Sequence, residues 1–371
     1  MNTLDKARVL GDAGKYDVCG GEICKPPEIT EGLNNLPGII KTKTEAGHFC
    51  SLLKTLQTNA CKHDCKYCAN RAGGSCQKKI ASFEPEELSG LFNVLVKKRI
   101  VTGLFLSSGI AGEPDAAAEK MLRTVRLVRH KYKFKGYIHF KVLPGMSYEL
   151  VKEASALASR LSINVEAPSK ARLSELSSVK ELQSDILKRQ SWIKKLSPPS
   201  GQTTQIIVGA NGESDLEILR MSKWEYDNMN LRRCYYSAFS PVKGTPLENH
   251  EKQPQSRANR LYNTDWLLRV YKYDFHLVRE VMNEEMLPNK DPKLAIAENT
   301  FTEPLNVSDA SFEELIRVPG IGLKTAEKII QMRESKAVKA ETLRQCGVVM
   351  KRASPFIKVS GEKQIRLMAF A

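Results

Sequence analysis

The stretch NACKHDCKYCANRAGG, residues 59–74, carries three cysteines, Cys61, Cys65 and Cys68, in the spacing C-x3-C-x2-C. It follows an apolar, β-favouring run, LLKTLQT (52–58), so we expect the thiols on a loop directly after a strand. Structural zinc sites usually take two separated ligand pairs, and the sequence holds no second C-x-x-C or H-x3–5-H pair. In a [4Fe–4S] cluster, three cysteines leave one iron without a protein ligand and therefore open for chemistry.

Outward from this loop, short apolar runs alternate with longer helix-like segments. The runs are LFLSS (104–108), YIHFKV (137–142), LSINVE (161–166), TQIIVG (204–209) and CYYSAF (234–239). Parallel strands need helical crossovers and are buried on both faces, so this alternation predicts an α/β fold, an open or closed βα barrel. Functional groups are then expected at the carboxyl ends of the strands.

The cysteine spacing, with aromatic Tyr67 directly before the third cysteine, resembles the signature of the radical S-adenosylmethionine (radical SAM) superfamily. The resemblance implies a partial (β/α)6 TIM-like barrel and two cofactors, a [4Fe–4S] cluster on Cys61, Cys65 and Cys68 and S-adenosyl-L-methionine on the open iron. It also implies reductive cleavage of that cofactor to a 5′-deoxyadenosyl radical, which abstracts a substrate hydrogen. Cys76 is interpreted as non-ligating.

Further positions resemble cofactor-binding segments of the same superfamily. SSGIAGEPD (107–115) resembles its Gly-Gly-Glu-Pro segment, with Ala111 in place of the first glycine, and IVGANGESD (207–215) resembles its adenine-flanking strand. Asn164 and Glu166 end the fourth expected strand, where Glu166 forms either a cofactor contact or a barrel-end salt bridge. Pro241 and Gly244 are expected to turn the chain near the adenine. The cofactor-binding residues implied are Tyr67, Ser108, Gly112, Glu113, Asn164, Val208 and Gly209, with Ser107 as a further contributor.

Near the carboxyl end, RVPGIGLKTA (317–326) places two glycines between two short helical patterns. Backbone N–H groups at the start of the following helix form an anion site, to which Lys324 adds a full charge. The segment resembles the helix-hairpin-helix motif, which grips the nucleic-acid backbone without reading bases. GVVMKRA (347–353) suggests a second, degenerate hairpin. The implied DNA-binding residues are Gly320, Gly322, Lys324, Thr325, Lys351 and Arg352; a protein-binding hairpin is the alternative.

The composition indicates a globular protein and favours a polyanionic partner, with solubilising surface charge as the alternative. Of 371 residues 42% are hydrophobic and 27% charged, and the formal net charge is +15. Residues 119–200 alone hold 17 basic and 7 acidic side chains. No apolar stretch reaches the roughly 18 residues of a membrane span, so no membrane association is expected. MNTLDKARVLGD (1–12) lacks a signal-like apolar stretch, which predicts a reducing cytoplasm.

We expect four parts: an irregular extension (1–45), a radical SAM barrel with a helical extension (46–287), a linker (288–304) and a small all-α helix-hairpin-helix domain (305–371). Cys19 and Cys24 in the extension are interpreted as free thiols, with a second metal or redox site as the alternative.

From about residue 45 onward the chain resembles the bacterial DNA modification/repair radical SAM protein family. That resemblance implies DNA as substrate, a reductant such as flavodoxin or ferredoxin, and a uracil-DNA-glycosylase-like partner. RNA modification and a non-catalytic iron–sulfur nucleic-acid-binding protein are the alternatives.

Overall fold

The computed structural model describes residues 1–14, 33–43, 49–74 and 79–359, which divide into two compact units. The first unit comprises Met1–Glu213 and Arg220–Pro254, and the second comprises Ser214–Leu219 and Gln255–Ala371.

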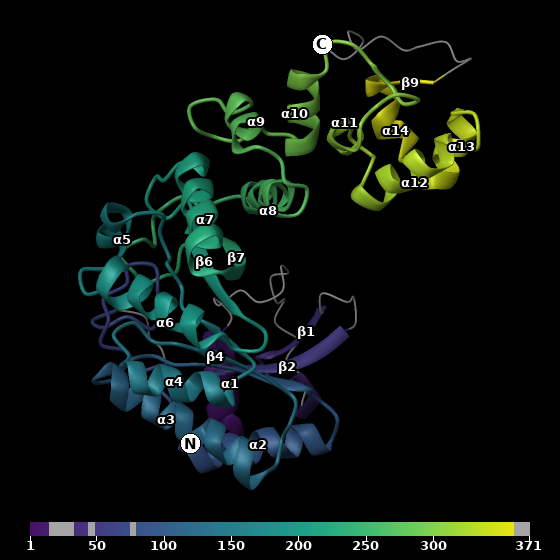
Figure 1. Cartoon of the computed structure of the whole chain (residues 1–371). Coiled ribbons are helices and arrows are strands. Elements are labelled where there is room, and N and C mark those ends of the chain that lie inside the picture. The colour runs from purple at the N-terminus through teal and green to yellow at the C-terminus, as the bar shows by residue number, and fades with distance from the viewer. Residues whose placement is uncertain (15–32, 44–48, 75–78, 360–371) are drawn as a thin grey trace. The chain divides into compact units, whose positions relative to one another are not determined.

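The first unit is built on a seven-stranded sheet in which every strand neighbours the next in sequence (Figure 1). Strand β1 (Ile39–Lys43) pairs antiparallel with β2 (Phe49–Leu56), and all later strands are parallel. In the described part of the chain β1 and β7 are its edges, so the sheet is an open barrel with six parallel strands, as predicted. The later strands are β3 (Gly103–Ser107), β4 (Tyr137–Lys141), β5 (Arg160–Ser162), β6 (Gln202–Val208) and β7 (Leu231–Ala238).

Helices connect the parallel strands, and α2, α3 and α4 lie together along one side of the sheet (Figure 1). Helices α2 and α3 each begin with a proline. Proline is favourable at this position because N–H groups in the first turn have no hydrogen-bond partner within the helix, so its missing N–H costs nothing. Strands β3 and β6 are buried along their whole length, as expected for a covered parallel sheet. The helices are α2 (Pro85–Lys97), α3 (Pro114–Arg126), α4 (Tyr148–Leu157), α5 (Lys170–Leu176), α6 (Lys188–Leu196) and α7 (Asp215–Met229).

Residues 1–45 are not irregular throughout, contrary to the prediction. Helix α1 (Thr3–Ala13) starts at Asn2, whose side chain accepts a hydrogen bond from the Asp5 N–H at 2.9 Å, and β1 extends the sheet. Ala7 and Leu10 are buried, and the helix packs on β2. Gly11 lies so close to Pro37 that no side chain fits there. Gly11 therefore allows a close contact between α1 and the backbone of Pro37.

The described residues of the second unit form helices and one short two-stranded parallel sheet. It contains α8 (Gln255–Arg269), α9 (Phe275–Glu280), α10 (Pro292–Thr300), α11 (Phe312–Arg317), α12 (Leu323–Arg333), α13 (Ala340–Cys346) and α14 (Met350–Ala353), with β8 (Leu305–Asn306) paired to β9 (Ile357–Lys358).

Two expected boundaries in this region differ from the structure. The expected linker contains α10, because Asp291 caps its first turn by accepting from the Leu294 N–H at 3.1 Å and Pro292 occupies its first position. The helical extension after residue 255 belongs to the same compact unit as the hairpins rather than to the barrel.

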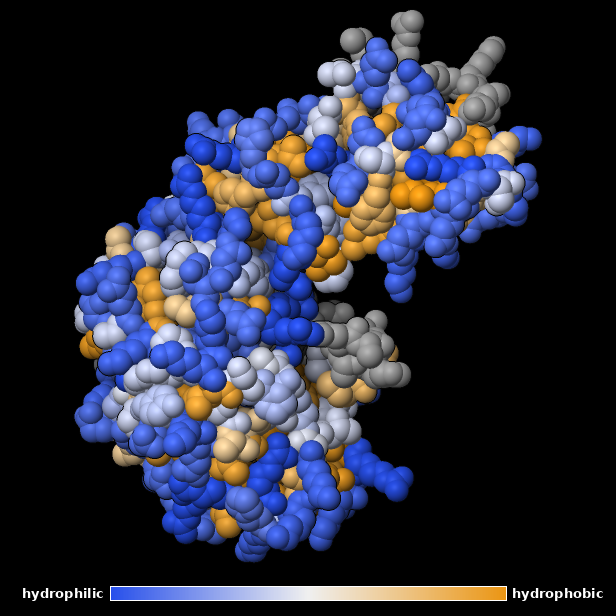
Figure 2. Space-filling model, viewed as in Figure 1, coloured by the Kyte–Doolittle hydropathy of each residue, from blue (hydrophilic) through white to orange (hydrophobic). Residues whose placement is uncertain are grey.

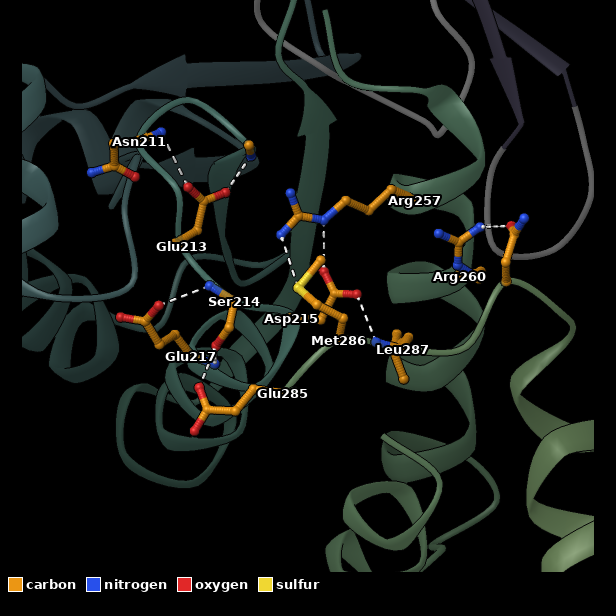
Figure 3. A network of polar contacts seen from close by, with 12 residues as sticks. Asn211, Glu213, Ser214, Asp215, Glu217, Arg257, Arg260, Glu285, Met286 and Leu287 are labelled. Atoms are coloured by element: carbon orange, nitrogen blue, oxygen red, sulfur yellow. Dashed lines mark hydrogen bonds and ion pairs between the residues drawn. The ribbon is translucent and has the colours of Figure 1, made fainter. Parts of the chain in front are cut away.

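A buried ion pair explains why the first turn of α7 belongs to the second unit (Figure 3). The Asp215 carboxylate is fully buried and accepts from Arg257 Nε of α8 at 2.8 Å and from the Leu287 N–H at 3.0 Å. Beside it, Ser214 Oγ donates to Glu285 at 2.8 Å. Three chain segments are therefore joined through one carboxylate.

Hydrophilic residues cover much of the face seen in Figure 2. Among the described residues, no helix is both long and apolar enough to cross a membrane.

Candidate active site

The three cysteines lie together at the carboxyl ends of the parallel strands. Cys61, Cys65 and Cys68 line a cavity of about 220 Å³ in the first unit. Its wall includes residues from the ends of the parallel strands or just beyond them, as expected for a βα barrel. Among these are Leu56, Ser107, Ser108, Lys141, Asn164, Glu166, Gln205, Ile207 and Ser237.

The cysteine loop is held by its own backbone and by the segment after α5. Asp64 accepts from the hydroxyls of Ser177 and Ser178, both at 2.6 Å, and from the Ser178 N–H. Although partial burial opposes the shift, these hydrogen bonds lower the pKa of Asp64 to about 2. Arg71 donates to the Asp64 carbonyl at 3.2 Å. The carboxylate is thus ionised and fixes the loop between Cys61 and Cys65.

The donor set fits a cluster. Cys65 is buried, and Cys61 and Cys68 are half-buried. Burial, reinforced by neighbouring Cys65, raises the pKa of the Cys68 thiol to about 12, and coordination to iron would deprotonate it. Among the described residues no three Cys, His, Asp or Glu side chains converge on a single ion site. In a cluster each thiolate binds its own iron, so convergence on one point is not required.

A lysine that sequence reasoning missed completes the cavity. Lys180, after α5, lies 3.3 Å from Glu166 Oε1 and 3.2 Å from the Tyr67 hydroxyl, and its Nζ stands 5.8 Å from the Tyr67 ring centroid. Burial opposes its charge, but the electrostatic interactions of Lys180 with Cys65, Glu166 and Cys68 outweigh burial and raise its pKa. The cavity thus contains a fixed positive charge next to its thiols. In the sequence, nothing distinguishes Lys180 from the other basic residues of the segment 119–200.

Glu166 has the salt bridge that was one of its two expected roles. Its backbone is in the left-handed region, with φ of +63°, while its N–H donates to the Gln205 carbonyl and its C=O accepts from the Ile207 N–H. Non-glycine residues in this region carry strain that the surrounding structure must hold. This isolated bridge to β6 therefore holds the Glu166 backbone in place at the cavity wall.

The remaining cofactor positions divide into those on the cavity wall and those off it. Ser107, Ser108, Asn164 and Tyr67 line the cavity. Gly112 and Glu113 do not; Glu113 precedes α3 and pairs with Lys62 at 2.7 Å.

On the strand side, Val208 is fully buried, and Gly209, with φ of +84°, lines a neighbouring cavity that also contains Lys66. Pro241 and Gly244 are on neither cavity wall. Their cofactor roles, like those of Gly112 and Glu113, stay predictions, while Cys19, Cys24 and Cys76 lie outside the described residues.

In the second unit, α11 and α12 form the predicted hairpin. Gly320 has φ of +87°, and Gly322 is the N-cap of α12 with no side-chain cap. The first N–H groups of an α-helix have no partner within the helix, so this turn leaves donors for an anion. Lys324 is exposed and Thr325 half-buried on that first turn.

The second hairpin is also present, and it packs on the first. Gly347, with φ of +95°, joins α13 to α14, and the Val349 N–H donates to the Gly320 carbonyl at 3.0 Å. Lys351 is exposed, as expected for a phosphate contact. Arg352 is paired with Asp291 at 3.0 Å, a partner that the sequence did not reveal.

Comparison with known families matches both parts of the chain. Residues 56–224 match the radical SAM superfamily, and residues 303–331 match the helix-hairpin-helix motif. The chain therefore contains a radical SAM domain. It is an enzyme, and enzymes of this superfamily use a [4Fe–4S] cluster and S-adenosylmethionine. When bound, these cofactors supply the electron and the sulfonium from which a 5′-deoxyadenosyl radical is made.

The relatives of this radical SAM enzyme are distant. Threonylcarbamoyladenosine tRNA methylthiotransferase MtaB of Thermotoga maritima is 24% identical over 196 residues, covering 52% of this chain and 44% of the relative. The hydrogenase maturase HydG of Carboxydothermus hydrogenoformans is 11% identical, with a TM-score of 0.47, covering 58% of this chain and 50% of that one. Methylornithine synthase PylB is 15% identical, with the same TM-score, covering 57% and 60%. The chain thus spans less than two thirds of each.

Proposed function

We propose that this radical SAM enzyme modifies or repairs DNA. The observation that carries the proposal is the uncapped start of α12 beside Gly320, with exposed Lys324, in the same chain as the cysteine-lined cavity. Helix-hairpin-helix turns hold the phosphate backbone irrespective of sequence. Duplex stacking hides the reactive atoms of a base, so the target nucleotide must be extruded into the cavity.

Within this proposal the cavity residues have distinct roles. Cys61, Cys65 and Cys68 hold the cluster, and the loop braced by Asp64 sets their positions. Lys180 supplies a positive charge to the anionic thiolates and to the carboxylate of bound S-adenosylmethionine. Tyr67, Ser107, Ser108 and Asn164 contact the cofactor, while Gly112, Glu113, Val208 and Gly209 shape its surroundings.

RNA modification is the second candidate, and a specific observation favours it. By its name, the curated relative that is 24% identical acts on tRNA. The two candidates share the cavity and differ in the nucleic acid held by the second unit. The third possibility from the sequence, a non-catalytic binding protein, is not retained because the radical SAM domain supports an enzyme.

Two measurements test the proposal on the full-length, cluster-reconstituted enzyme with reductant. Mass spectrometry of nucleosides after incubation is expected to reveal a new product in duplex DNA, accompanied by 5′-deoxyadenosine. A Cys61→Ala enzyme is the matched control and is expected to form neither. Competition between duplex DNA and structured RNA for binding decides between the candidates, and preference for RNA with a product in RNA alone would refute the DNA proposal.

The expected partners follow from the same proposal. A flavodoxin or ferredoxin supplies the electron, a cytoplasmic location gives access to both reductant and DNA, and a uracil-DNA-glycosylase-like protein acts in the same repair process. Purification of the tagged enzyme from its host under anaerobic conditions tests whether the reductant protein and the glycosylase-like protein bind to it.

A further inference from the structure

Helix α10 brings a lysine to the first hairpin turn. Lys293 Nζ donates to the Ile321 carbonyl at 2.6 Å, and Ile321 lies between the two glycines of that turn. The same ammonium stands 4.7 Å from the centroid of the Tyr271 ring, in the segment after α8. Lys293 belongs to the stretch expected to be a linker, so only the folded second unit places it at the turn.

Within the described residues, the charge of Lys293 is offset only in part, by the negative charge of Asp291. The acidic group nearest in sequence, Asp291, is already engaged by Arg352 at 3.0 Å and by the Leu294 N–H at 3.1 Å. No described carboxylate forms an ion pair with Lys293. An ammonium has three N–H donors, and the Ile321 carbonyl takes one of them. Two donors and a partly offset positive charge therefore remain at the hairpin turn.

This arrangement is unfavourable for the protein alone. Lys293 is half-buried, and Arg352, a second cation, also packs on the turn, with its Cβ 3.1 Å from where a Cβ on Gly320 would stand. Burial, and then the positive charge of Arg352, lower the pKa of Lys293 to about 8. A half-buried cation next to another cation is relieved by an anion bound at the same place.

We propose that Lys293 is a phosphate-binding residue of the hairpin, in which its ammonium and the N–H groups at the start of α12 hold one phosphodiester of duplex DNA. The inference rests on the proposed DNA function and assigns to the hairpin a ligand from α10, outside the motif itself. Tyr271 orients the ammonium through its ring face, and the Ile321 carbonyl holds it against the turn.

The proposal predicts a pH dependence with a definite sign. A bound phosphate favours charged Lys293, so its pKa is higher in the complex than in the free protein. Binding is therefore strongest below pH 8 and weakens as the pH rises through about 8. The other groups facing Lys293 are Asp291, Arg352 and Tyr271.

The test uses full-length enzyme and a fluorescein-labelled DNA duplex, with Kd measured by anisotropy over pH 7–9 and over a range of salt. Lys293→Met is expected to raise Kd at pH 7 roughly 10- to 100-fold, the range of a charge-assisted hydrogen bond. It is also expected to reduce the slope of log Kd against log salt by about 0.9, the value for one phosphate contact on duplex DNA.

Lys293→Arg keeps a positive charge at this position but removes its titration near pH 8, so it tests whether the charge of Lys293 contributes to binding or whether Lys293 only supports the turn. It is expected to bind close to wild type at pH 7 and to lose the weakening above pH 8. Lys290→Met is the matched control on the same segment, because Lys290 pairs with Glu298 instead. It is expected to bind like wild type.

Two outcomes distinguish the failure of this inference from failure of the DNA function. If Lys324→Glu weakens binding while Lys293→Met binds like wild type, or if Lys293→Arg keeps the wild-type pH dependence, Lys293 is not a phosphate ligand. If Lys324→Glu and wild type bind duplex DNA alike, the hairpin itself has no role, and the proposed function fails with it.

Discussion

Alanine substitutions at the two glycines of the first hairpin are expected to fail in different ways. A Cβ on Gly320 would stand 2.6 Å from the Val349 carbonyl oxygen and 3.2 Å from the Val349 Cβ, and φ at Gly320 is +87°. A Cβ on Gly322 would meet only the Tyr271 hydroxyl, at 3.5 Å, and φ there is −96°. Gly320→Ala therefore collides with backbone of the second hairpin, whereas Gly322→Ala fits.

The magnitudes follow from those two environments. A left-handed backbone costs an L-residue about 1–2 kcal/mol, and a collision with packed neighbouring atoms adds about 1–3 kcal/mol. Gly320→Ala should thus destabilise the second unit by roughly 2–5 kcal/mol. Gly322→Ala changes only an N-cap residue and should cost about 1 kcal/mol or less. Its methyl group instead obstructs the approach of a phosphate to the N–H groups of α12.

Amide hydrogen exchange of α11–α14, measured with duplex binding on the same full-length samples, separates the two effects. Gly320→Ala is expected to lose exchange protection across both hairpins and to lose binding as a consequence. Gly322→Ala is expected to keep protection and bind weakly. Wild-type protection in Gly320→Ala would refute the packing argument, and wild-type binding by Gly322→Ala would refute the phosphate site.

Three further predictions concern the rest of the chain. Alanine at any one of the three cavity cysteines should abolish retention of a reducible [4Fe–4S] cluster or cleavage of S-adenosylmethionine, whereas Cys76→Ala should retain both. Electron paramagnetic resonance detects the cluster, and 5′-deoxyadenosine production reports the cleavage. The reverse pattern would overturn the ligand assignment. Asp215→Ala removes the buried carboxylate that pairs with Arg257, so urea unfolding should show a loss of about 3–5 kcal/mol; a loss below about 1 kcal/mol would contradict the pair's importance. Burial raises the pKa of Glu225 to about 8, above its unfolded value, so the free energy of unfolding should fall as the pH rises from about 4.5 to 8. Glu225→Gln should remove that fall. If wild type and Glu225→Gln lose stability in parallel over this pH range, Glu225 is not the source of the fall.

Much of the fold and of the cluster site was predictable from local sequence. The spacing of Cys61, Cys65 and Cys68 puts three thiols on one loop whatever surrounds it, and six apolar runs separated by helical segments predict parallel βα units. The same holds for the first hairpin, where glycines permit a backbone that other residues avoid. These features depend on residues within a few positions of one another, so covalent geometry and periodicity suffice to predict them.

The unit boundaries depended on tertiary packing. Polar, proline-containing segments look like linkers, yet α10 forms because Asp291 and Pro292 start a helix that packs within the second unit. Removing residues 305–371 would therefore cut through a compact unit rather than release a domain, and single substitutions are the sound probes of the hairpins.

The positions of the charged side chains around the cysteine-lined cavity and the first hairpin likewise depend on the tertiary structure. Lys180 meets Tyr67 across 113 residues of sequence, and Lys293 meets Ile321 across 28. No local pattern distinguishes these lysines from the other basic side chains among the 57 Lys and Arg of the chain. Whether a lysine is a solvated surface group or a buried charge beside a ligand depends on which distant segments fold against it, because burial and neighbouring charges determine its energy.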